Sequence, residues 1–172
     1  LTERGICYSL STNPTIANGK FIDNNFYSDL GEFTITVTNL SAGTKYYAKA
    51  YATNSYGTAY GEEITFTTLP ATPAIVTTNS IYSITQNSAY CSGNISDDGG
   101  ATVTERGFCY STNTTSPTIS NSKISSGTGI GSFYRNITQL SSGTTYYVRA
   151  YSVNKAGVSY GNTLSFKTQS AT

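Results

Sequence analysis

The sequence contains no histidine, no methionine and no tryptophan, and charged residues are scarce. Only 11% of the 172 residues are charged, and 10 Lys and Arg against 9 Asp and Glu give a net charge of +1. This balance provides no basic patch of the kind that binds nucleic acid. Long apolar runs are also absent, and none approaches the ~20 residues that cross a bilayer. We therefore expect neither nucleic-acid binding nor membrane insertion.

The missing histidines also narrow the chemistry. Histidine is the most frequent general base, and metal sites commonly use histidine or paired Cys-x-x-Cys motifs, which the sequence lacks. The run Asp97-Asp98-Gly99-Gly100 favours a β-turn over a calcium site, because no third acidic ligand lies nearby. We predict that the protein is not an enzyme, with no catalytic residues, no metal site and no cofactor.

The sequence is rich in tyrosine and glycine, and it repeats itself. Residues 2–9 (TERGICYS) return as residues 104–111 (TERGFCYS), and residues 40–51 return at 140–151. Matches of this length in the same order indicate a tandem duplication. We predict an incomplete first module at 1–69, a proline-containing linker at 70–73, a complete module at 74–169, and the start of a further linker at 170–172.

Both copies alternate apolar and polar residues between clusters of Gly, Asn and Ser, which is typical of an all-β sandwich. No segment shows a helical period, so we expect almost no helix. The second copy is predicted to form strands near 75–84, 87–96, 103–112, 132–139, 144–154 and 159–168. The first copy supplies only four of these, near 1–10, 32–39, 44–54 and 59–68.

The first copy has no counterpart of residues 74–102, because its opening Leu1-Thr2-Glu3 aligns with Val103-Thr104-Glu105. A sandwich without those two strands leaves apolar surface and strand edges in water. We expect the missing strands to come either from an upstream part of a longer chain, cut inside a repeat, or from a neighbouring subunit by β-strand addition.

The pattern Leu40-x-x-Gly43-Thr44-x-Tyr46, repeated at Leu140-x-x-Gly143-Thr144-x-Tyr146, resembles the fibronectin type III signature. The resemblance implies tandem fibronectin type III or immunoglobulin-like sandwiches, with Tyr46 and Tyr146 as the structural tyrosine corner. The run Val103–Thr112, with Gly127–Phe133 and Tyr146–Tyr151 after it, resembles more narrowly the fibronectin-like repeats of Bacteroidota secreted and cell-surface proteins. That resemblance implies an extracellular or cell-surface location.

The three cysteines are Cys7, Cys91 and Cys109, and Cys7 and Cys109 are equivalent in the two copies. If Cys91 and Cys109 both point inward, a disulfide between them could join the two sheets, and the partner of Cys7 would lie upstream. The alternative is a pair of small buried thiols.

An outward row of aromatic and cationic residues is the main candidate contact surface. If Cys109 points inward, three further residues of its strand join that face, and the loop Phe21–Tyr27 of the first copy is a separate candidate. Sheet stabilisation, protein contact and carbohydrate binding remain open for the row, whereas the apolar residues of the loop either cover an exposed edge or make a contact. The surface-contact candidates are Tyr47, Lys49, Tyr51, Arg106, Phe108, Tyr110, Tyr147, Arg149, Tyr151, Phe21, Phe26 and Tyr27.

Together these features predict a non-catalytic structural or adhesive repeat of a secreted or surface-exposed bacterial protein. It would act as a spacer, a stalk or a filament building block, with strand complementation between subunits as one route of assembly. The expected partners are other copies of the same protein or neighbouring repeats, with glycans or cell-surface proteins as further candidates. The alternative is a carbohydrate-binding accessory module of a larger extracellular enzyme.

Overall fold

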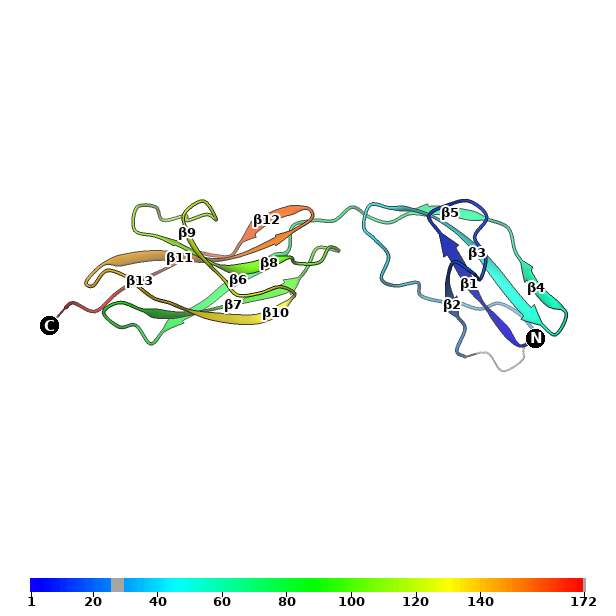
Figure 1. The fold of residues 1–172 in the computed structure, drawn as a ribbon, viewed down its shortest axis with the longest axis horizontal. Coiled ribbons are helices and arrows are strands. Elements are labelled where there is room, and N and C mark those ends of the chain that lie inside the picture. Colours follow the sequence, from blue (N-terminus) through cyan, green and yellow to red (C-terminus); the bar gives the residue numbers. More distant parts are fainter. Residues whose placement is uncertain (26–29, 172) are drawn as a thin grey trace. The chain divides into compact units, whose positions relative to one another are not determined.

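The computed structural model describes residues 1–25 and 30–171, and it divides the chain into two compact units, Leu1–Pro70 and Ala71–Thr172 (Figure 1). Within those residues the chain is all-β and contains no helix. Accordingly, the described part of the chain offers no helix that is long and apolar enough to cross a membrane.

The second unit is a sandwich of two antiparallel sheets (Figure 1). One sheet has the order β12 (Gly157–Tyr160), β11 (Thr145–Asn154), β8 (Glu105–Ser111) and β9 (Ser122–Ser125), and β13 (Leu164–Lys167) also pairs with β11. The other sheet has the order β10 (Gly131–Ile137), β7 (Ala89–Asp97) and β6 (Ile75–Tyr82). Alternating residues of the two sheets fill the core between them. These include Ala89, Cys91, Ile95, Phe108, Phe133, Val148 and Ala150.

The first unit repeats only the first of these sheets. Its order is β2 (Gly19–Ile22), β1 (Glu3–Ser9), β3 (Lys45–Asn54) and β4 (Gly57–Tyr60), with β5 (Ile64–Thr67) also paired to β3. The register is the same in both copies, since Ile6 lies opposite Ala50 as Phe108 lies opposite Ala150. Among the described residues, this unit has no second sheet.

The strand predicted at 32–39 is wrong, because no strand forms there. Its counterpart β10 has a single ladder partner, which is β7, and the first unit has no equivalent of β7 among its described residues. The segment keeps the alternating sequence of a strand but has no neighbour to which its backbone can hydrogen-bond. It runs in Figure 1 as a trace without an arrow between β2 and β3.

Two further differences concern short strands. The segments 59–68 and 159–168 each divide into two strands, because the chain bends at Gly61 and Gly161, whose N–H groups donate to the carbonyls of Ala50 and Ala150. The four-residue strands β2 and β9 were not predicted. They are short edge strands in polar sequence, where alternation gives little signal.

The expected disulfide between Cys91 and Cys109 is not formed, because the two thiols lie on opposite faces of the β8 sheet. Cys91 belongs to the core between the sheets, where burial raises its pKa to about 12. Cys109 points the other way, and its Sγ lies 3.3 Å from the carbonyl oxygen of Pro117. Cys7 is likewise a buried free thiol, 3.5 Å from the carbonyl oxygen of Pro14. The error was the assumed direction of β8, which instead buries Phe108 in the core.

Candidate functional site

The inner face of the sheet in the first unit carries a continuous row of aromatic rings. The ring of Tyr8 lies 5.5 Å from that of Phe21 and 6.0 Å from that of Tyr46, and Tyr46 stacks on Phe66 at 5.8 Å. Period-2 alternation adds Ile6, Ala48 and Ala50 to the same face. We call this set of residues the open face: Ile6, Tyr8, Phe21, Tyr46, Ala48, Ala50, Ile64 and Phe66.

The open face and its counterpart in the second unit differ in side-chain burial at two positions. Ala50 is exposed, whereas Ala150 is completely buried. Ile64 is 63% exposed, whereas Leu164 packs against the core. An apolar sheet face of this kind is normally covered by a second layer. On the first unit this face is covered at Tyr46 and Ala48, which are 6% and 4% exposed, but among the described residues no second sheet packs on it.

The segment that follows β2 is held beside this face at both of its ends. The guanidinium of Arg4 lies 4.9 Å from the centre of the Phe33 ring and donates to the carbonyl of Gly31 at 3.4 Å. At the other end, the N–H of Ser41 donates to the hydroxyl of Tyr46 at 3.0 Å. Because Arg106 lies over Phe133 in the same way, at 5.0 Å, the segment begins where β10 begins in the second unit. The residues equivalent to β10 therefore lie beside the open face, and no partner strand is paired with them among the described residues.

The loop between β2 and this segment differs between the copies. In the first unit Asp23 is buried and forms an ion pair with Arg4, with Oδ2 2.8 Å from Nε. In the second unit Arg106 instead donates to backbone carbonyls, including that of Ile130 at 2.8 Å. Of the loop residues proposed as contacts, Phe21 belongs to the open face, and Phe26 and Tyr27 lie outside the described residues. Arg106 is accordingly occupied in holding its own loop.

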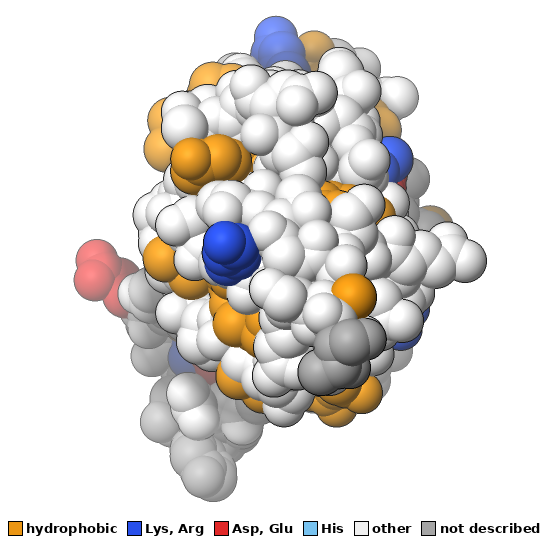
Figure 2. Space-filling view, turned by 90° about the vertical axis from the view of Figure 1, so that its left-hand side faces the viewer, with side chains coloured by type: hydrophobic (Ala, Val, Ile, Leu, Met, Phe, Trp, Pro, Cys, Tyr) orange, Lys and Arg blue, Asp and Glu red, His pale blue; other side chains and the backbone are white. Residues whose placement is uncertain are grey.

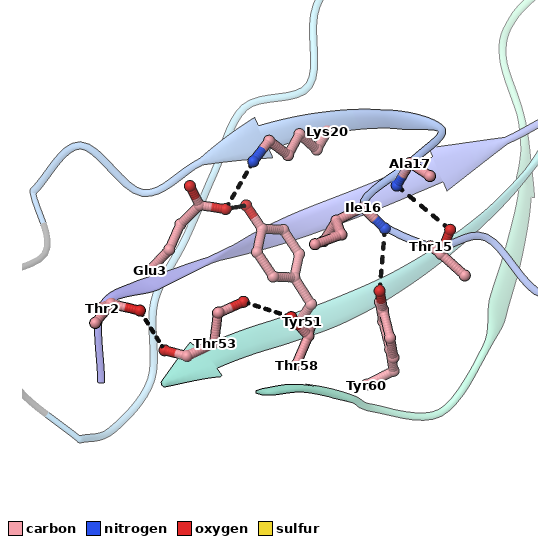
Figure 3. A network of polar contacts seen from close by, with 10 residues as sticks. All are labelled: Thr2, Glu3, Thr15, Ile16, Ala17, Lys20, Tyr51, Thr53, Thr58 and Tyr60. Carbon is pink, nitrogen blue, oxygen red and sulfur yellow. Dashed lines mark hydrogen bonds and ion pairs between the residues drawn. The ribbon is translucent and has the colours of Figure 1, made fainter. Parts of the chain in front are cut away.

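The outer face of the sheet in the first unit carries a network of polar contacts (Figure 3). The Oε1 atom of Glu3 accepts hydrogen bonds from Lys20 Nζ at 2.8 Å and from the Tyr51 hydroxyl at 2.7 Å. These bonds, that from Lys20 first, lower the pKa of Glu3, while burial and the Glu3 carboxylate raise the pKa of Tyr51. Glu105 makes the same contacts with Lys123 and Tyr151 in the second unit.

This network overturns part of the predicted contact surface. Tyr51 and Tyr151 lie on the outer sheet face but are only 2% and 0% exposed, because β2 and β9 bring lysine side chains over their rings. Phe108 is in the core and not on the outer face, because β8 points Phe108 inward and Cys109 outward. Tyr110 also faces the inner side and packs at the edge of the core, 6.3 Å from Tyr146.

Four members of the predicted row remain, and all are partly exposed: Tyr47, Lys49, Tyr147 and Arg149. Lys45 lies over the ring of Tyr47 at 5.0 Å, and Lys49 Nζ donates to Asn13 Oδ1 at 3.1 Å. Arg149 donates to the carbonyl of Gly161 at 2.9 Å and stacks on Tyr160. Tyr147 is also half-buried. The row does not form the uninterrupted aromatic platform that the sequence predicted.

The predicted tyrosine corners have a direct structural counterpart. The N–H of Ser141 donates to the hydroxyl of Tyr146 at 2.9 Å, as Ser41 does to Tyr46. In both copies Tyr46 or Tyr146 also stacks on the phenylalanine of the last strand. These tyrosines tie the loop before the long central strand to the core, which is a structural role.

Sequence reasoning missed an exposed tyrosine group on the outer face of the β10–β7–β6 sheet. Tyr82 and Tyr90 lie opposite each other in the ladder and stack at 5.7 Å, and both are exposed. Tyr134, which is 68% exposed, lies opposite Ser92, the next residue of β7 on the same face as Tyr90. We call Tyr82, Tyr90 and Tyr134 the tyrosine face. Alternation could have found it, because Tyr90 adjoins the inward Ala89 and Cys91.

The surface offers little titratable chemistry. Figure 2 shows mostly uncharged side chains with scattered hydrophobic ones and few charged groups. A shallow groove at one end of the second unit is lined by hydroxyls and amides, among them those of Tyr110, Asn121 and Gln139. Within residues 1–25 and 30–171, no three His, Cys, Asp or Glu side chains gather where a metal ion could bind. The arrangement is suited to contact and packing.

No protein-family model matches the sequence, and neither does any curated protein. Solved structures do match it. The chicken CNTN1 FN1–FN3 domains match at 14% identity and a TM-score of 0.48, over 97% of this chain and 56% of that one. A fourth FNIII domain from human matches at 23% identity and 0.46, over 62% of this chain and 88% of that one. The sensor domain of the anti-sigma factor RsgI4 in Pseudobacteroides cellulosolvens matches at 21% and 0.41, over 58% and 98%.

The fold class follows from the strands and sheets of the chain itself. The described residues are all-β, their sheets are antiparallel, the second unit is a two-sheet sandwich, and the first unit has the equivalent of one of its sheets. The predicted fold class is therefore confirmed.

Proposed function

We propose that this chain is a non-catalytic structural repeat of a secreted or surface-exposed protein, in which it acts as a spacer, a stalk or a filament building block. In this proposal the open face is the joint, and strands supplied from outside the first unit close its sandwich. The observation that carries the proposal is the contrast between two copies of one module, of which one packs its inner face against a second sheet and the other leaves Ala50 and Ile64 of that face exposed.

Physical chemistry supports a joint at this position. The face combines aromatic rings and small apolar side chains, and exposed apolar surface next to an unpaired strand-like segment is a template for adding strands. Main-chain hydrogen bonds then supply affinity, and the pockets between alternate side chains supply specificity. On the outer faces, the polar networks around Glu3 and Glu105 pair charged side chains with one another, which suits a structural module with no reaction to catalyse.

The test is photo-crosslinking of the protein in the cells that make it. A photoreactive residue replaces Ala50 on the open face, and a matched variant carries it at Thr65, which is exposed on the other side of the sheet. We expect the Ala50 position to crosslink to peptides of the same polypeptide or of another copy, and the Thr65 position to do so far less. A first unit that gives no crosslink at Ala50 would remove the joint, and with it the proposed function.

A second candidate function is favoured by the tyrosine face. Exposed tyrosines bordered by the hydroxyls of Ser80 and Ser92 offer the mixture of ring faces and hydrogen-bonding groups that suits sugars. On this alternative the chain is a carbohydrate-binding accessory module of a larger extracellular enzyme.

A panel of immobilised polysaccharides separates the two candidates. Replacing Tyr82, Tyr90 and Tyr134 with alanine should abolish retention on any glycan that binds, whereas Tyr56→Ala, at a 98% exposed tyrosine of the first unit, should leave it unchanged. If the unmodified chain binds none of the glycans, the carbohydrate function is excluded.

A further inference from the structure

We infer that the open face binds a β-hairpin with the sequence pattern of β6–β7, one that is not already packed in a sandwich of its own. The inference rests on the proposed function, because it names the partner that the joint takes. Its basis lies in the second unit, where the same chain packs such a hairpin on the equivalent face.

The backbone of the first unit is arranged to pair with the second strand of this hairpin. In the second unit β7 pairs with β10 so that Gly93 lies opposite Phe133 and Ala89 opposite Ile137. The equivalent positions in the first unit are Phe33 and Val37, on the segment already held beside the face by Arg4 and Tyr46. A strand added there would convert 33–39 into the strand that its sequence predicts.

Two contacts of the hairpin have a receiving residue that the first unit retains, whereas a third, from the N–H of Thr78 to Asn162 Oδ1 at 3.1 Å, would meet Glu62 there. The N–H of Ala150 donates to the hydroxyl of Thr78 at 2.9 Å. Gly93 passes so close to Ala150 that a Cβ on it would lie 3.0 Å from the Ala150 Cβ and 3.0 Å from the Phe133 ring. Ala50 and Phe33 are identical to these two receiving residues. The partner hairpin should therefore carry glycine at the position of Gly93 and a hydroxyl at that of Thr78.

Where the two faces differ, the first unit has the smaller side chain at three positions and the larger one at Phe21, which replaces Ile124. Ile6 replaces Phe108, Ala48 replaces Val148, and Val37 replaces Ile137. Loss of volume leaves room for a hairpin, whereas added volume would force side chains into strained positions. None of these three replacements blocks the hairpin.

The hairpin sequence and the open face both carry almost no charge. Asp97, the last residue of β7, is the one charged residue in the hairpin sequence 75–97. The residues that define the open face include no Asp, Glu, Lys or Arg. Binding should accordingly rest on apolar burial and backbone pairing, and it should change little with salt.

A second copy of this chain is the less suitable occupant. Its hairpin is already packed in its own second unit, where Ala89 and Cys91 are completely buried. Moving that hairpin to another copy would close one sandwich and open an equal apolar face in the donor. An exchange of this kind gains no net buried area, whereas a hairpin that starts in solvent gains the whole of it.

The experiment adds a synthetic peptide of residues 71–102 to the full chain and follows backbone amide hydrogen exchange by mass spectrometry. We expect saturable protection that is confined to the open face and to residues 33–39, with little dependence on salt. The peptide variant Gly93→Leu should bind about tenfold or more weakly, because its side chain would meet Ala50 and Phe33. Tyr90→Ser, on the exposed side of the hairpin, should bind as the parent peptide does.

A pair of variants tests the receiving side. Ala50→Leu fills the space left for the glycine and should abolish binding, and it should fold normally because Ala50 is exposed. Thr65→Leu, on the opposite side of the same sheet, should leave binding unchanged. Equal losses from both variants would overturn the inference.

A graft removes the dependence on peptide solubility. Fusing a copy of residues 71–102 directly before Leu1 should protect 33–39 and raise the unfolding temperature of the first unit, and the Gly93→Leu graft should not.

The remaining outcomes are distinct. Unchanged exchange in both formats overturns the inference, and the proposed function survives this if Ala50 still crosslinks in cells. Concentration-dependent protection of 33–39 without any peptide would make a second copy the occupant and would also overturn it. Peptide binding without crosslinking at Ala50 would leave the recognition intact and remove the proposed function.

Discussion

In the second unit, the sheet built on β8 and β11 packs against the sheet of β10, β7 and β6, and Phe108 and Ala150 are completely buried between them. In the first unit, the equivalent sheet has the same strand order and register, yet Ile6 is half-buried and Ala50 is exposed. The outer sides of the two sheets hardly differ, since Glu3 and Glu105 accept the same pair of hydrogen bonds. The duplication therefore separates two contributions to one fold. Both units have the polar network on the outer face of the sheet. Among the described residues, only the second unit has another sheet packed on the inner face.

This separation indicates which part of the module each element depends on. The sheet of the first unit forms without a second sheet packed on its inner face, because its strand pairings and its tyrosine-corner hydrogen bond involve only residues of that unit. The segment 32–39 does not form a strand, because its hydrogen-bond partner belongs to the absent layer. Closing the layer is therefore expected to affect the inner face strongly and the outer face little.

The largest expected difference between the units comes from a matched truncation of the inner face. Phe108→Ala should reduce the free energy of unfolding of the second unit by about 3–5 kcal/mol, since a large side chain leaves a cavity in a closed core. Ile6→Ala at the equivalent position should reduce that of the first unit by about 1 kcal/mol, because the side chain is already half in water. Urea unfolding, with hydrogen exchange to report on each unit, measures both. Equal losses would mean that the first unit has a closed core.

The tyrosine corners should give a smaller effect. Tyr146→Phe removes the acceptor of the Ser141 N–H, and Tyr46→Phe removes that of Ser41. Each should cost its unit about 1 kcal/mol, the usual net value of a hydrogen bond. Because the first unit is open to water on one side, its orphaned N–H can be solvated more easily, so that Tyr46→Phe should be the milder change. Thermal unfolding of the two variants checks the order, and a larger loss from Tyr46→Phe would contradict it.

The sequence predicted features that depend on local pattern. Leu140, Gly143 and Tyr146 identified a β-sandwich strand and its preceding turn, and alternation placed most strands because each pleat exposes its period directly. The direction of β8 could not be read in the same way, since Gly107, Phe108 and Cys109 are all buried. Cys109 is buried outside the core because the loop carrying Pro117 covers it. Burial on both faces of a strand removes the alternation from which direction is inferred.

The candidate site depended on information that no single segment carries. The absence of β6 and β7 counterparts was visible from the alignment of the two copies. Its effect on 32–39 was not, because a strand requires a partner as well as a suitable sequence. The burial of Tyr51 and Tyr151 was also hidden, since it follows from the unpredicted strands β2 and β9 and their lysines Lys20 and Lys123.

Acid should weaken the Glu3 and Glu105 networks of the two units alike and only slightly. The hydrogen bond from the Tyr151 hydroxyl, with that from Lys123, lowers the pKa of Glu105, and Lys20 and Tyr51 lower that of Glu3. A carboxyl whose folded pKa lies below its unfolded value stabilises the fold at neutral pH, and this contribution is lost as the pH falls through the folded pKa. Both ion pairs are partly exposed, so each unit should lose less than about 1 kcal/mol.

The variants Glu105→Gln and Glu3→Gln test this equivalence. Each should flatten the acid dependence of its own unit below the usual pKa range of glutamate and leave the other unit unchanged. Stability measured against pH for both variants would contradict the equivalence if one unit kept its full acid dependence.

The thiols provide the smallest effect on stability and a sensitive comparison of the two units. Because Cys7, Cys91 and Cys109 are free, a reducing agent should leave the unfolding temperature of both units unchanged. In the native protein all three thiols are buried, and burial raises the pKa of Cys109 to about 11, so that alkylation requires local opening. Cys7 should react first, because the unit that contains it lacks the inner layer, and Cys91 and Cys109 should follow together when the closed unit opens. Mass spectrometry of peptides during a time course of iodoacetamide labelling measures this order, with the urea-unfolded chain as the control in which all three react. Labelling of Cys109 as fast as Cys7 would show that the inner layer does not set the opening of either unit.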